Sequence, residues 1–372
     1  MRVLVTGADG FIGRNLRQHL AVRQGIEVVA VTRGTDPASL PSLLEGIDFV
    51  AHLAGVNRPR SACEFVTGNV EFTAALVAAL ADRAQRAGVR PPVFYASSTQ
   101  VALDNPYGRS KLAAEGVLLD LHERFGQVIR ICRLPNVFGK WARPNYNSVV
   151  ATFCHNTTRG LPIEVRDPAA PLTLVYVDDV VGAIIAMLEG EFGEGPLCSV
   201  TPQYATTVGE IATLIRGFCE SRRTLVTERV GTGLMRALYA TYVSYLPPDR
   251  FAYEVPRHAD ARGEFVEMLK TVDSGQFSFF TAYPGVTRGG HYHHSKTEKF
   301  LVIRGEARFR FRHVLTGEMH EIMTSGCSPT IVETAPGWTH DVTNVGASEL
   351  VVMLWANEIL DRGRPDTYSC AL

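Results

Sequence analysis

The 372-residue sequence predicts an α/β domain built on a parallel sheet, followed by a smaller all-β domain. Up to about residue 230, short runs rich in β-branched residues alternate with longer stretches of helical period, which is typical of βαβ units. After about residue 255, strand-like runs are separated by Gly, Pro and Asp turns, with no amphipathic helix between them. A length of 372 residues, at roughly 150 per domain, agrees with two or three domains.

Hydrophobic periodicity predicts the elements of the first domain. Strands are predicted at residues 2–6, 27–32, 47–54, 92–98 and 127–134. Most of the predicted helices show apolar residues three and four apart, and they cover residues 10–23, 71–88, 110–125 and 177–189. The pattern predicts the fold class but not the order of the strands.

The second domain is predicted to be a small all-β barrel or jelly roll. Its strand candidates lie in residues 275–284, 299–314, 330–336 and 349–357. The segment 246–249, Leu-Pro-Pro-Asp, cannot continue a helix and lies between the two patterns. We therefore predict domains at residues 1–247 and 248–372.

Composition excludes several classes of function. Lys plus Arg number 37 and Asp plus Glu 38, so no net field would draw the chain to a polyanion. The apolar stretch at the N-terminus is too short for a signal peptide, and the longest apolar run, residues 180–188, falls below the roughly 18 residues that span a bilayer. The seven cysteines are scattered, odd in number and never spaced as Cys-x-x-Cys, which indicates a reducing compartment. We expect a soluble cytoplasmic protein that binds neither nucleic acid nor membrane.

A glycine-rich turn follows the first predicted strand and precedes a helix. Its pattern, Gly-x-x-Gly-x-x-Gly, lets a pyrophosphate approach backbone amides at a helix N-terminus. The residues expected to hold this dinucleotide are Gly7, Gly10, Phe11, Ile12 and Gly13. Arg33 ends the second strand, where NAD-preferring proteins usually carry an acid, and its charge suits the 2′-phosphate of NADPH. A plain tight turn and a solvated surface Arg are the alternatives.

Ser98, Tyr107 and Lys111 form a candidate catalytic set. Tyr107 and Lys111 lie four residues apart on one helix face, so the ammonium can sit beneath the phenol and favour its phenolate. The Ser98 hydroxyl can then hold a carbonyl oxygen while hydride reaches the carbon and Tyr107 supplies the proton. A surface pair at a helix start is the alternative, but the glycine turn and the strand ending in Ser98 favour catalysis.

The first 230 residues resemble extended short-chain dehydrogenase/reductases. The motifs are TGADGFIG, HLAG at 52–55, ASS at 96–98 and YGRSK at 107–111. The resemblance implies a Rossmann domain that binds a nucleotide sugar at the carboxyl side of its sheet, with further cofactor contacts from Leu53, Ala54, Lys111 and Pro135. Related 4,6-dehydratases carry an acidic pair after the catalytic hydroxyl, but here Thr99 and Gln100 follow Ser98, so water elimination lacks its acid and base.

A basic loop follows the last predicted strand of the first domain. Residues 133–154 offer cations and amides suited to a diphosphate and sugar hydroxyls, although a Pro-ended strand and a surface loop would show the same composition. The candidate substrate-binding residues are Asn136, Lys140, Arg143, Asn145 and Asn147.

Histidines in the second domain have metal-ligand spacing. His291 and His293 share one face of a strand by its period of two, Glu298 follows on the next strand, and His340 can complete the set. This spacing resembles the two cupin motifs. We expect one divalent metal per chain, with zinc the first choice.

The same domain resembles sugar-nucleotide epimerases of deoxysugar pathways through residues 260–267 and 288–292. The resemblance implies substrate contacts from Arg262 and Arg288. In those relatives the histidine that corresponds to His291 serves as the catalytic base. Here His291 is expected to bind the metal instead. Tyr283, Tyr292 and His294 remain open as the base.

Across nearly the whole chain, the combination resembles bifunctional capsular-polysaccharide enzymes of the CapF type. The resemblance implies a homodimer acting on a UDP-linked 2-acetamido-2,6-dideoxy-4-ketohexose. The cupin would invert carbon 3, and the reductase would then reduce the 4-ketone with NADPH. The product would be a UDP-6-deoxy-talose-type precursor of UDP-N-acetyl-L-fucosamine.

The residues are compatible with three other functional interpretations. The cupin could be a structural module beside the same reductase. The chain could be a non-catalytic NADP-sensing regulator, which the intact Ser98, Tyr107 and Lys111 disfavour. It could also be an NAD-retaining 4-epimerase, which Arg33 disfavours.

Overall fold

The computed structural model describes residues 1–59, 61, 63–255, 257–260, 263–266, 269–271, 275–358 and 363–372. These residues form two compact units. The first comprises Met1–Ser148 and Leu172–Ala205, and the second comprises Val149–Pro171 and Thr206–Leu372.

The first unit contains a six-stranded parallel sheet with the order β2-β1-β3-β4-β5-β8. Its strands are β1 Arg2–Thr6, β2 Glu27–Val31, β3 Phe49–His52, β4 Val93–Ser98, β5 Ile129–Leu134 and β8 Leu197–Cys198. The order reverses between β1 and β3, and ligands of doubly wound sheets bind at the carboxyl edge beside such a point. The structure therefore confirms the predicted Rossmann-like fold.

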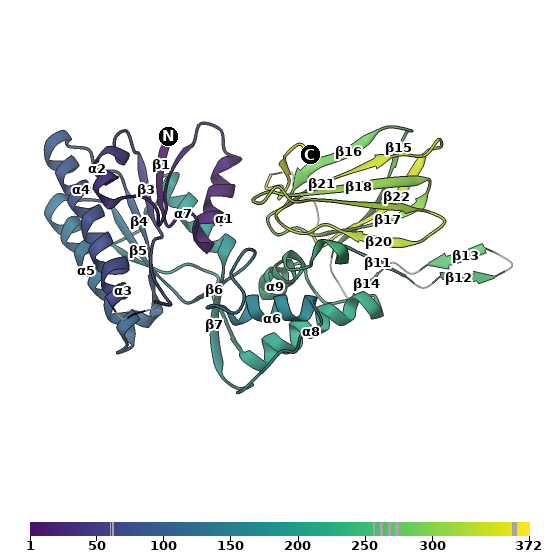
Figure 1. Ribbon diagram of the computed structural model, residues 1–372, viewed down its shortest axis with the longest axis horizontal. Helices are drawn as coiled ribbons and strands as arrows, with labels where there is room; N and C mark the ends of the chain where they lie inside the picture. The colour runs from purple at the N-terminus through teal and green to yellow at the C-terminus, as the bar shows by residue number, and fades with distance from the viewer. Residues whose placement is uncertain are drawn as a thin grey trace. The chain divides into compact units, whose positions relative to one another are not determined.

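Helices cover both faces of this sheet (Figure 1). On one face, α1 Phe11–Ala21 and α7 Val177–Leu188 contribute Leu16 and Ile184 to a core with Val3 and Val5. On the other face lie α2 Leu40–Leu43, α4 Phe72–Ala87 and α5 Pro106–Phe125, whose core includes Leu4 and Val50. Because successive residues of β1 face opposite cores, its three central residues, Val3, Leu4 and Val5, are all apolar.

Shorter elements connect the main ones in this unit. A helical turn α3 Cys63–Phe65 and a π-helical stretch Val66–Glu71 lead into α4. By length and composition alone, the run Cys63–Ala87 could cross a membrane, although the sequence analysis predicts no membrane span. Leu76 and Leu80 of this run are buried in the sheet core. Strand β6 Asn136–Phe138 pairs in parallel with β7 Pro171–Tyr176, and β9 spans Tyr204–Thr207.

Helix α5 begins four residues earlier than predicted. Asn105 caps it by accepting a 2.7 Å hydrogen bond from the Gly108 N–H, and Pro106 occupies the first turn. Tyr107 therefore lies in the first turn of the helix that also carries Lys111, as the catalytic prediction requires.

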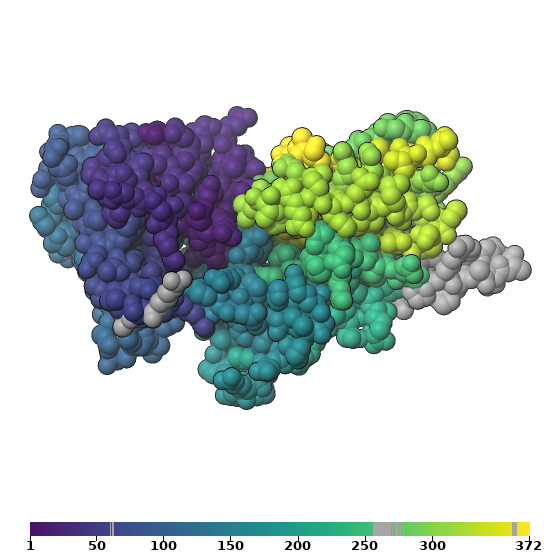
Figure 2. Space-filling view, viewed as in Figure 1, coloured from purple at the N-terminus to yellow at the C-terminus, as the bar shows by residue number. Residues whose placement is uncertain are grey.

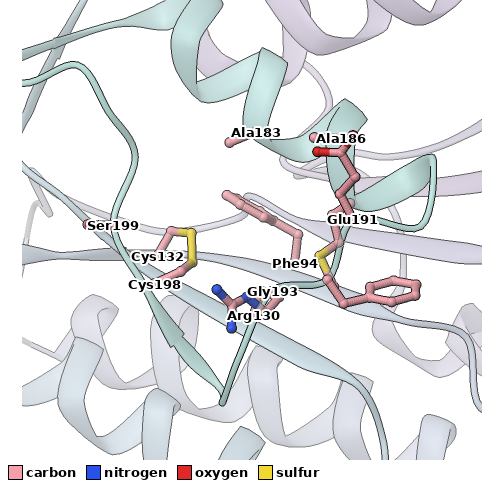
Figure 3. A pocket seen from close by; sticks show the side chains of 11 residues that line it. Phe94, Arg130, Cys132, Ala183, Ala186, Glu191, Gly193, Cys198 and Ser199 are labelled. Carbon is pink, nitrogen blue, oxygen red and sulfur yellow. A yellow bond between two sulfur atoms is a disulfide. The ribbon is translucent and has the colours of Figure 1, made fainter.

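The prediction of a wholly reduced set of cysteines is wrong for one pair. Cys132 on β5 and Cys198 on β8 form a disulfide across neighbouring parallel strands, 66 residues apart in sequence. The bond lines a cavity of about 180 Å³ together with Phe94, Arg130 and Glu191 (Figure 3). Sequence spacing did not reveal the pair because strand order, which brings β8 beside β5, is not a local pattern.

The second unit contains two five-stranded sheets. One has the order β11-β20-β17-β22-β15, with strands β11 Ala252–Glu254, β20 Thr330–Glu333, β17 Glu298–Arg304, β22 Leu350–Ala356 and β15 Gln276–Ala282. The other has the order β19-β18-β21-β16-β23, with strands β19 Met319–Ser325, β18 Glu306–His313, β21 Trp338–Asn344, β16 Thr287–Tyr292 and β23 Tyr368–Ser369. Phe300 of the first sheet meets Phe309 of the second, with ring centroids 5.5 Å apart. The predicted all-β cupin-like domain is thereby confirmed.

Three helices join the strands in this unit, and none of them was predicted. They are α6 Val149–Thr158, α8 Val208–Thr224 and α9 Gly233–Ser244. Thr207 and Glu210 form a capping box at the start of α8, a signal that the sequence contains. In Figure 2, a space-filling view, green atoms of this unit adjoin its yellow-green atoms. The remaining short strands are β10 Val226–Thr227, β12 Arg257–Asp260, β13 Gly263–Val266 and β14 Lys270–Thr271.

A buried ion cluster connects these helices to the sheet. The Glu333 carboxylate on β20 pairs with Arg222 of α8 and, at 2.6 Å, with Lys299 of β17. The Tyr239 hydroxyl donates to it at 3.2 Å, and the Lys299 ammonium donates to Tyr253 at 2.9 Å. Burial raises the pKa of Glu333, but Arg222 and Lys299 together with the hydrogen bonds outweigh it, so the net pKa is lowered.

We expect Glu333→Gln to lower the free energy of unfolding of the second unit by about 3–5 kcal/mol at neutral pH, because it leaves two buried cations without their anion. A folded-state pKa below the unfolded value of about 4.3 means that the carboxylate stabilises above that pH and loses its contribution as pH falls through the folded pKa. The variant should therefore show a weaker acid-dependence of stability than the parent, measured by urea unfolding between about pH 3 and 7.

Glu321→Gln is the matched control. Glu321 is exposed and lies 3.9 Å from Arg308, so its loss should cost less than about 1 kcal/mol. Equal effects of the two substitutions would show that the Glu333 cluster is not stabilising.

Candidate active site and metal cluster

In the turn between β1 and α1, the backbone is packed so closely at positions 7 and 13 that only glycine fits. Gly7 has φ +64°, and a Cβ there would lie 2.8 Å from the Ala54 backbone N. A Cβ on Gly13 would lie 2.2 Å from the Gly7 carbonyl oxygen. The Thr6 hydroxyl accepts the N–H groups of Leu53 and Ala54, each at 3.1 Å. The predicted cofactor residues after β1 and after β3 are therefore side by side.

The N-terminus of α1 is suited to an anion. Gly10 at the cap offers no side-chain hydrogen bond, and no acidic residue occupies the first turn. The N–H groups of Phe11, Ile12 and Gly13 have no intrahelical acceptor at this end, and the helix dipole favours negative charge there. A pyrophosphate fits this cradle.

Arg33 lies exposed in the turn after β2. Among the residues that the structure describes, no acidic side chain forms an ion pair with it. Its position at the end of the second strand agrees with the site expected for contact with an adenosine ribose.

The structure brings Ser98 and Tyr107 together. Ser98 ends β4, its hydroxyl accepts the Gln100 N–H at 3.2 Å, and its side chain is near enough to the Tyr107 phenol to affect the pKa of that group. Burial raises the pKa of Tyr107 and the Ser98 side chain lowers it, with burial the larger effect. The phenol therefore keeps its proton at neutral pH.

The Lys111 ammonium instead points at β4. It donates to the Ala96 carbonyl at 2.7 Å and lies 4.1 Å from the Tyr95 ring centroid. Burial lowers the pKa of Lys111 to about 7, opposed by the charge of Glu115. The ammonium is thus poised to gain or lose its proton near neutrality.

Glu115 is a site residue that the sequence analysis missed. Its carboxylate is buried one helical turn after Lys111, accepts the Ser97 hydroxyl at 2.5 Å and pairs with Arg133 at 2.6 Å. The i, i+4 spacing from Lys111 was a usable signal.

His52 and Asn69 hold the loop after β3 and were also missed as structural supports. His52 hydrogen-bonds Thr6 at 2.7 Å and Thr73 at 2.9 Å, and burial followed by the Lys111 charge lowers its pKa to about 3. The Asn69 side chain accepts the Val56 N–H at 2.6 Å and donates to the hydroxyl of Ser110 on α5 at 2.9 Å.

The predicted substrate loop divides into buried and exposed residues. Lys140 is buried and pairs with Asp178 at 2.8 Å, so its ammonium has a partner inside the fold rather than in the loop. Asn136 is exposed on β6 and donates to the Thr173 carbonyl at 3.3 Å, while Pro135 links β5 to β6. The residues that remain exposed in the loop are Arg143, Asn145 and Asn147.

Four predicted metal ligands converge in the second unit. One atom each from His291, His293, Glu298 and His340 lies within 4.8 Å of the others. His291 and His340 are paired across β16 and β21, and a bulge between Gly289 and His291 shifts the register there. The predicted strand period and the order of the strands together produce this cluster.

The hydrogen bonds around the cluster fit a metal. The Nδ1 atom of His293 lies 2.5 Å from the Asp366 carbonyl, and that of His340 lies 3.4 Å from the Trp338 carbonyl. Their Nε2 atoms are buried and have no hydrogen-bond partner among the described residues. Lys296 pairs with one oxygen of Glu298 at 2.6 Å, which leaves the other oxygen near the histidines. This is the arrangement in which outer groups orient histidine ligands.

The predicted substrate and base residues of the cupin lie in different environments. Tyr292 and His294 are buried with ring centroids 5.4 Å apart, whereas Tyr283 is 74% exposed. Arg288 is exposed and donates to the Thr281 carbonyl at 2.9 Å. Arg262 lies outside the described residues. Asp366, which the sequence analysis did not assign, accepts the N–H groups of residues 294, 295 and 296.

Both parts of the chain match described families. Residues 3–196 match the NAD dependent epimerase/dehydratase family, and residues 258–368 match the polysaccharide biosynthesis C-terminal domain. The chain belongs to the NAD dependent epimerase/dehydratase family.

The similarity to particular proteins extends over the full length. The chain is 58% identical over 372 residues to UDP-2-acetamido-2,6-beta-L-arabino-hexul-4-ose reductase of Pseudomonas aeruginosa, covering 100% of this chain and 99% of that protein. A crystal structure of the capsular polysaccharide assembling protein CapF from Staphylococcus aureus matches with 39% identity, a TM-score of 0.67 and 100% coverage of both chains. UDP-glucuronic acid decarboxylase 5 of Arabidopsis thaliana is 24% identical over 58% of this chain and 74% of its own. The predicted resemblance to CapF-type proteins is confirmed.

Proposed function

We propose that residues 1–247 reduce the 4-keto group of a UDP-2-acetamido-2,6-dideoxy-hexos-4-ulose with NADPH. The observation that carries this proposal is the placement of Ser98 at the end of β4 and of a protonated Tyr107 in the first turn of α5, in the same unit as a glycine cradle suited to a dinucleotide. The name of the full-length Pseudomonas relative, a 4-ulose reductase acting on a UDP-sugar, supports the substrate class.

The residues of the first unit have separable roles in this reduction. NADPH, when bound, supplies the hydride. Ser98 holds the ketone oxygen, and Tyr107 delivers its proton to that oxygen as negative charge develops. Lys111, whose pKa burial lowers to about 7, provides positive charge behind the site when protonated, and the charge of Glu115 opposes this lowering.

Arg33 supports NADPH over NADH. An exposed guanidinium at the end of β2 can form a charge-assisted hydrogen bond with a 2′-phosphate. NADH lacks this group, and a carboxylate would suit its ribose diol better.

The second proposed activity is carbon-3 epimerisation by residues 248–372, before reduction. His291, His293, Glu298 and His340 would hold one divalent metal, with zinc favoured by the imidazole-rich set. When bound, the metal supplies Lewis-acid charge that favours loss of a proton next to the ketone. Arg262 and Arg288 would contact the substrate. The candidate bases are Tyr283, Tyr292 and His294.

We also propose a cytoplasmic homodimer that binds neither nucleic acid nor membrane. Strand β15 is the edge of its sheet and exposes Phe277 and Phe279, which are 47% and 70% exposed. Aromatic side chains on an exposed edge strand suit a second copy of the chain.

Tyr107→Phe should retain NADPH binding and lose turnover of the 4-ketosugar by roughly 100-fold or more, because the reduction loses its proton donor. NADPH affinity is measured by nucleotide fluorescence and turnover by its oxidation, with NADH run in parallel. Near-normal turnover would remove Tyr107 from the mechanism, and a preference of the parent for NADH would overturn the cofactor assignment.

Metal removal should destabilise the second unit before the first. A ligand present at about 1,000 times its Kd stabilises the state it binds by roughly 4 kcal/mol, so chelation should lower the melting temperature of that unit. Metal analysis should find about one ion per chain in the parent and in His320→Asn, and none in His293→Ala. Full metal occupancy in His293→Ala would contradict the assignment.

Epimerisation should not depend on hydride transfer. In heavy water, Tyr107→Phe given the 4-ketosugar should incorporate deuterium at carbon 3, whereas the double variant with His340→Ala should not. The double variant with His320→Asn serves as the matched control and should still exchange. Absence of exchange in Tyr107→Phe itself would leave the cupin a structural role.

A further inference from the structure

Two arginines converge on one tyrosine at the loops after β3 and β6. The guanidinium carbon of Arg58 lies 5.9 Å from the Tyr146 ring centroid, and that of Arg143 lies 5.2 Å from it. Arg58 and Tyr146 had no assigned role in the sequence analysis. We call Arg58, Tyr146 and Arg143 the arginine clamp.

The backbone that carries Tyr146 and Arg143 is strained. Trp141 and Asn145 adopt positive φ angles of 68° and 54°, which is uncommon for any residue with a side chain and rare for one as bulky as Trp. Such conformations persist only where the surrounding structure holds them, and they concentrate at ligand sites. The loop therefore presents its two clamp residues in a maintained geometry.

The clamp lies next to the reductase residues. Val56, two residues before Arg58, is bound by Asn69, which also binds Ser110 beside Lys111. A Cβ on Gly55 would lie 3.7 Å from the Lys111 ammonium, so this loop passes close to that group. The Phe65 ring lies 5.8 Å from the Tyr107 ring.

The charges of the clamp are not balanced within the fold. Arg58 and Arg143 are both exposed, and no described acidic residue forms an ion pair with either. Two like charges held on one ring repel each other, and Tyr146 offsets part of that repulsion through its negative ring face. A dianion placed between the guanidiniums would offset the remainder and accept their hydrogen bonds.

The cofactor does not need this second cationic site. Its pyrophosphate fits the N-terminus of α1, and its 2′-phosphate fits Arg33 after β2. The clamp belongs to the loop after β3, on the opposite side of the reversal point from β2, and to the loop after β6, a strand of the separate sheet β6-β7-β9. A second phosphate-bearing ligand is therefore the better match.

We infer that the arginine clamp binds the diphosphate of the nucleotide sugar and thereby places the sugar ring at Tyr107. This inference rests on the proposed reductase function. It adds Arg58 as a direct diphosphate ligand and Tyr146 as the residue that positions both guanidiniums.

The test is calorimetric titration of the full chain with UDP and, separately, with uridine. Arg58→Ala should weaken UDP binding about ten- to a hundred-fold, the scale of a lost hydrogen bond to a charged group, and leave uridine and NADPH binding unchanged. Arg86→Ala, which removes an exposed arginine on α4, is the control and should bind UDP like the parent. Parent-like UDP affinity in Arg58→Ala, or an equal loss of uridine affinity, would overturn the inference.

Tyr146 separates positioning from direct contact. Tyr146→Phe keeps the ring face and should bind UDP nearly as the parent does, whereas Tyr146→Leu should lose most of what Arg58→Ala loses. Equal affinity of the Phe and Leu variants would overturn the positioning role. If the UDP titrations confirm the clamp but the parent does not reduce a 4-ketosugar, the proposed substrate of the reductase is wrong. The clamp assignment then stands.

Discussion

The second unit depends on the buried carboxylate of Glu333, because this one anion neutralises two buried cations from distant parts of the chain. Arg222 comes from α8 and Lys299 from β17, so helix and sheet are joined by charge as well as by apolar contact. Lys299 directly follows Glu298, whose carbonyl accepts the N–H of Thr334 beside Glu333. The position of a candidate metal ligand is therefore linked to the charge balance of the helix–sheet junction. Such a network stabilises only while it is complete.

Buried charges are also compensated by neighbouring charges at the reductase site of the first unit. Lys111 is buried, and burial lowers its pKa to about 7 although Glu115 opposes the shift. Glu115 is itself compensated by Arg133 and the Ser97 hydroxyl. The Lys111 charge also helps to keep His52 neutral, so His52 serves as a hydrogen-bonding support rather than as an acid. Neighbouring titratable groups thus take different protonation states because their burial and partners differ.

The two candidate sites differ in their exposure to solvent. The arginine clamp stands on exposed loops, where cations can meet an anionic substrate before it is ordered. The histidine cluster lies between packed strands, where His293, Glu298 and His340 are all buried. Loops set on a rigid sheet suit recognition, and strand residues held by outer hydrogen bonds suit a fixed ligand geometry.

The sequence by itself determined the features that local periodicity encodes. The three glycines between positions 7 and 13 specify a turn whose backbone a ligand can approach, Tyr107 and Lys111 share a face by helical spacing, and His291 and His293 belong to one strand segment. Only the tertiary structure decided which distant residues meet. It buried Lys140 against Asp178, joined Cys132 to Cys198, and brought Arg58 to Tyr146. These contacts depend on the order of the strands and the course of the loops, and no short-range pattern of residues carries that information.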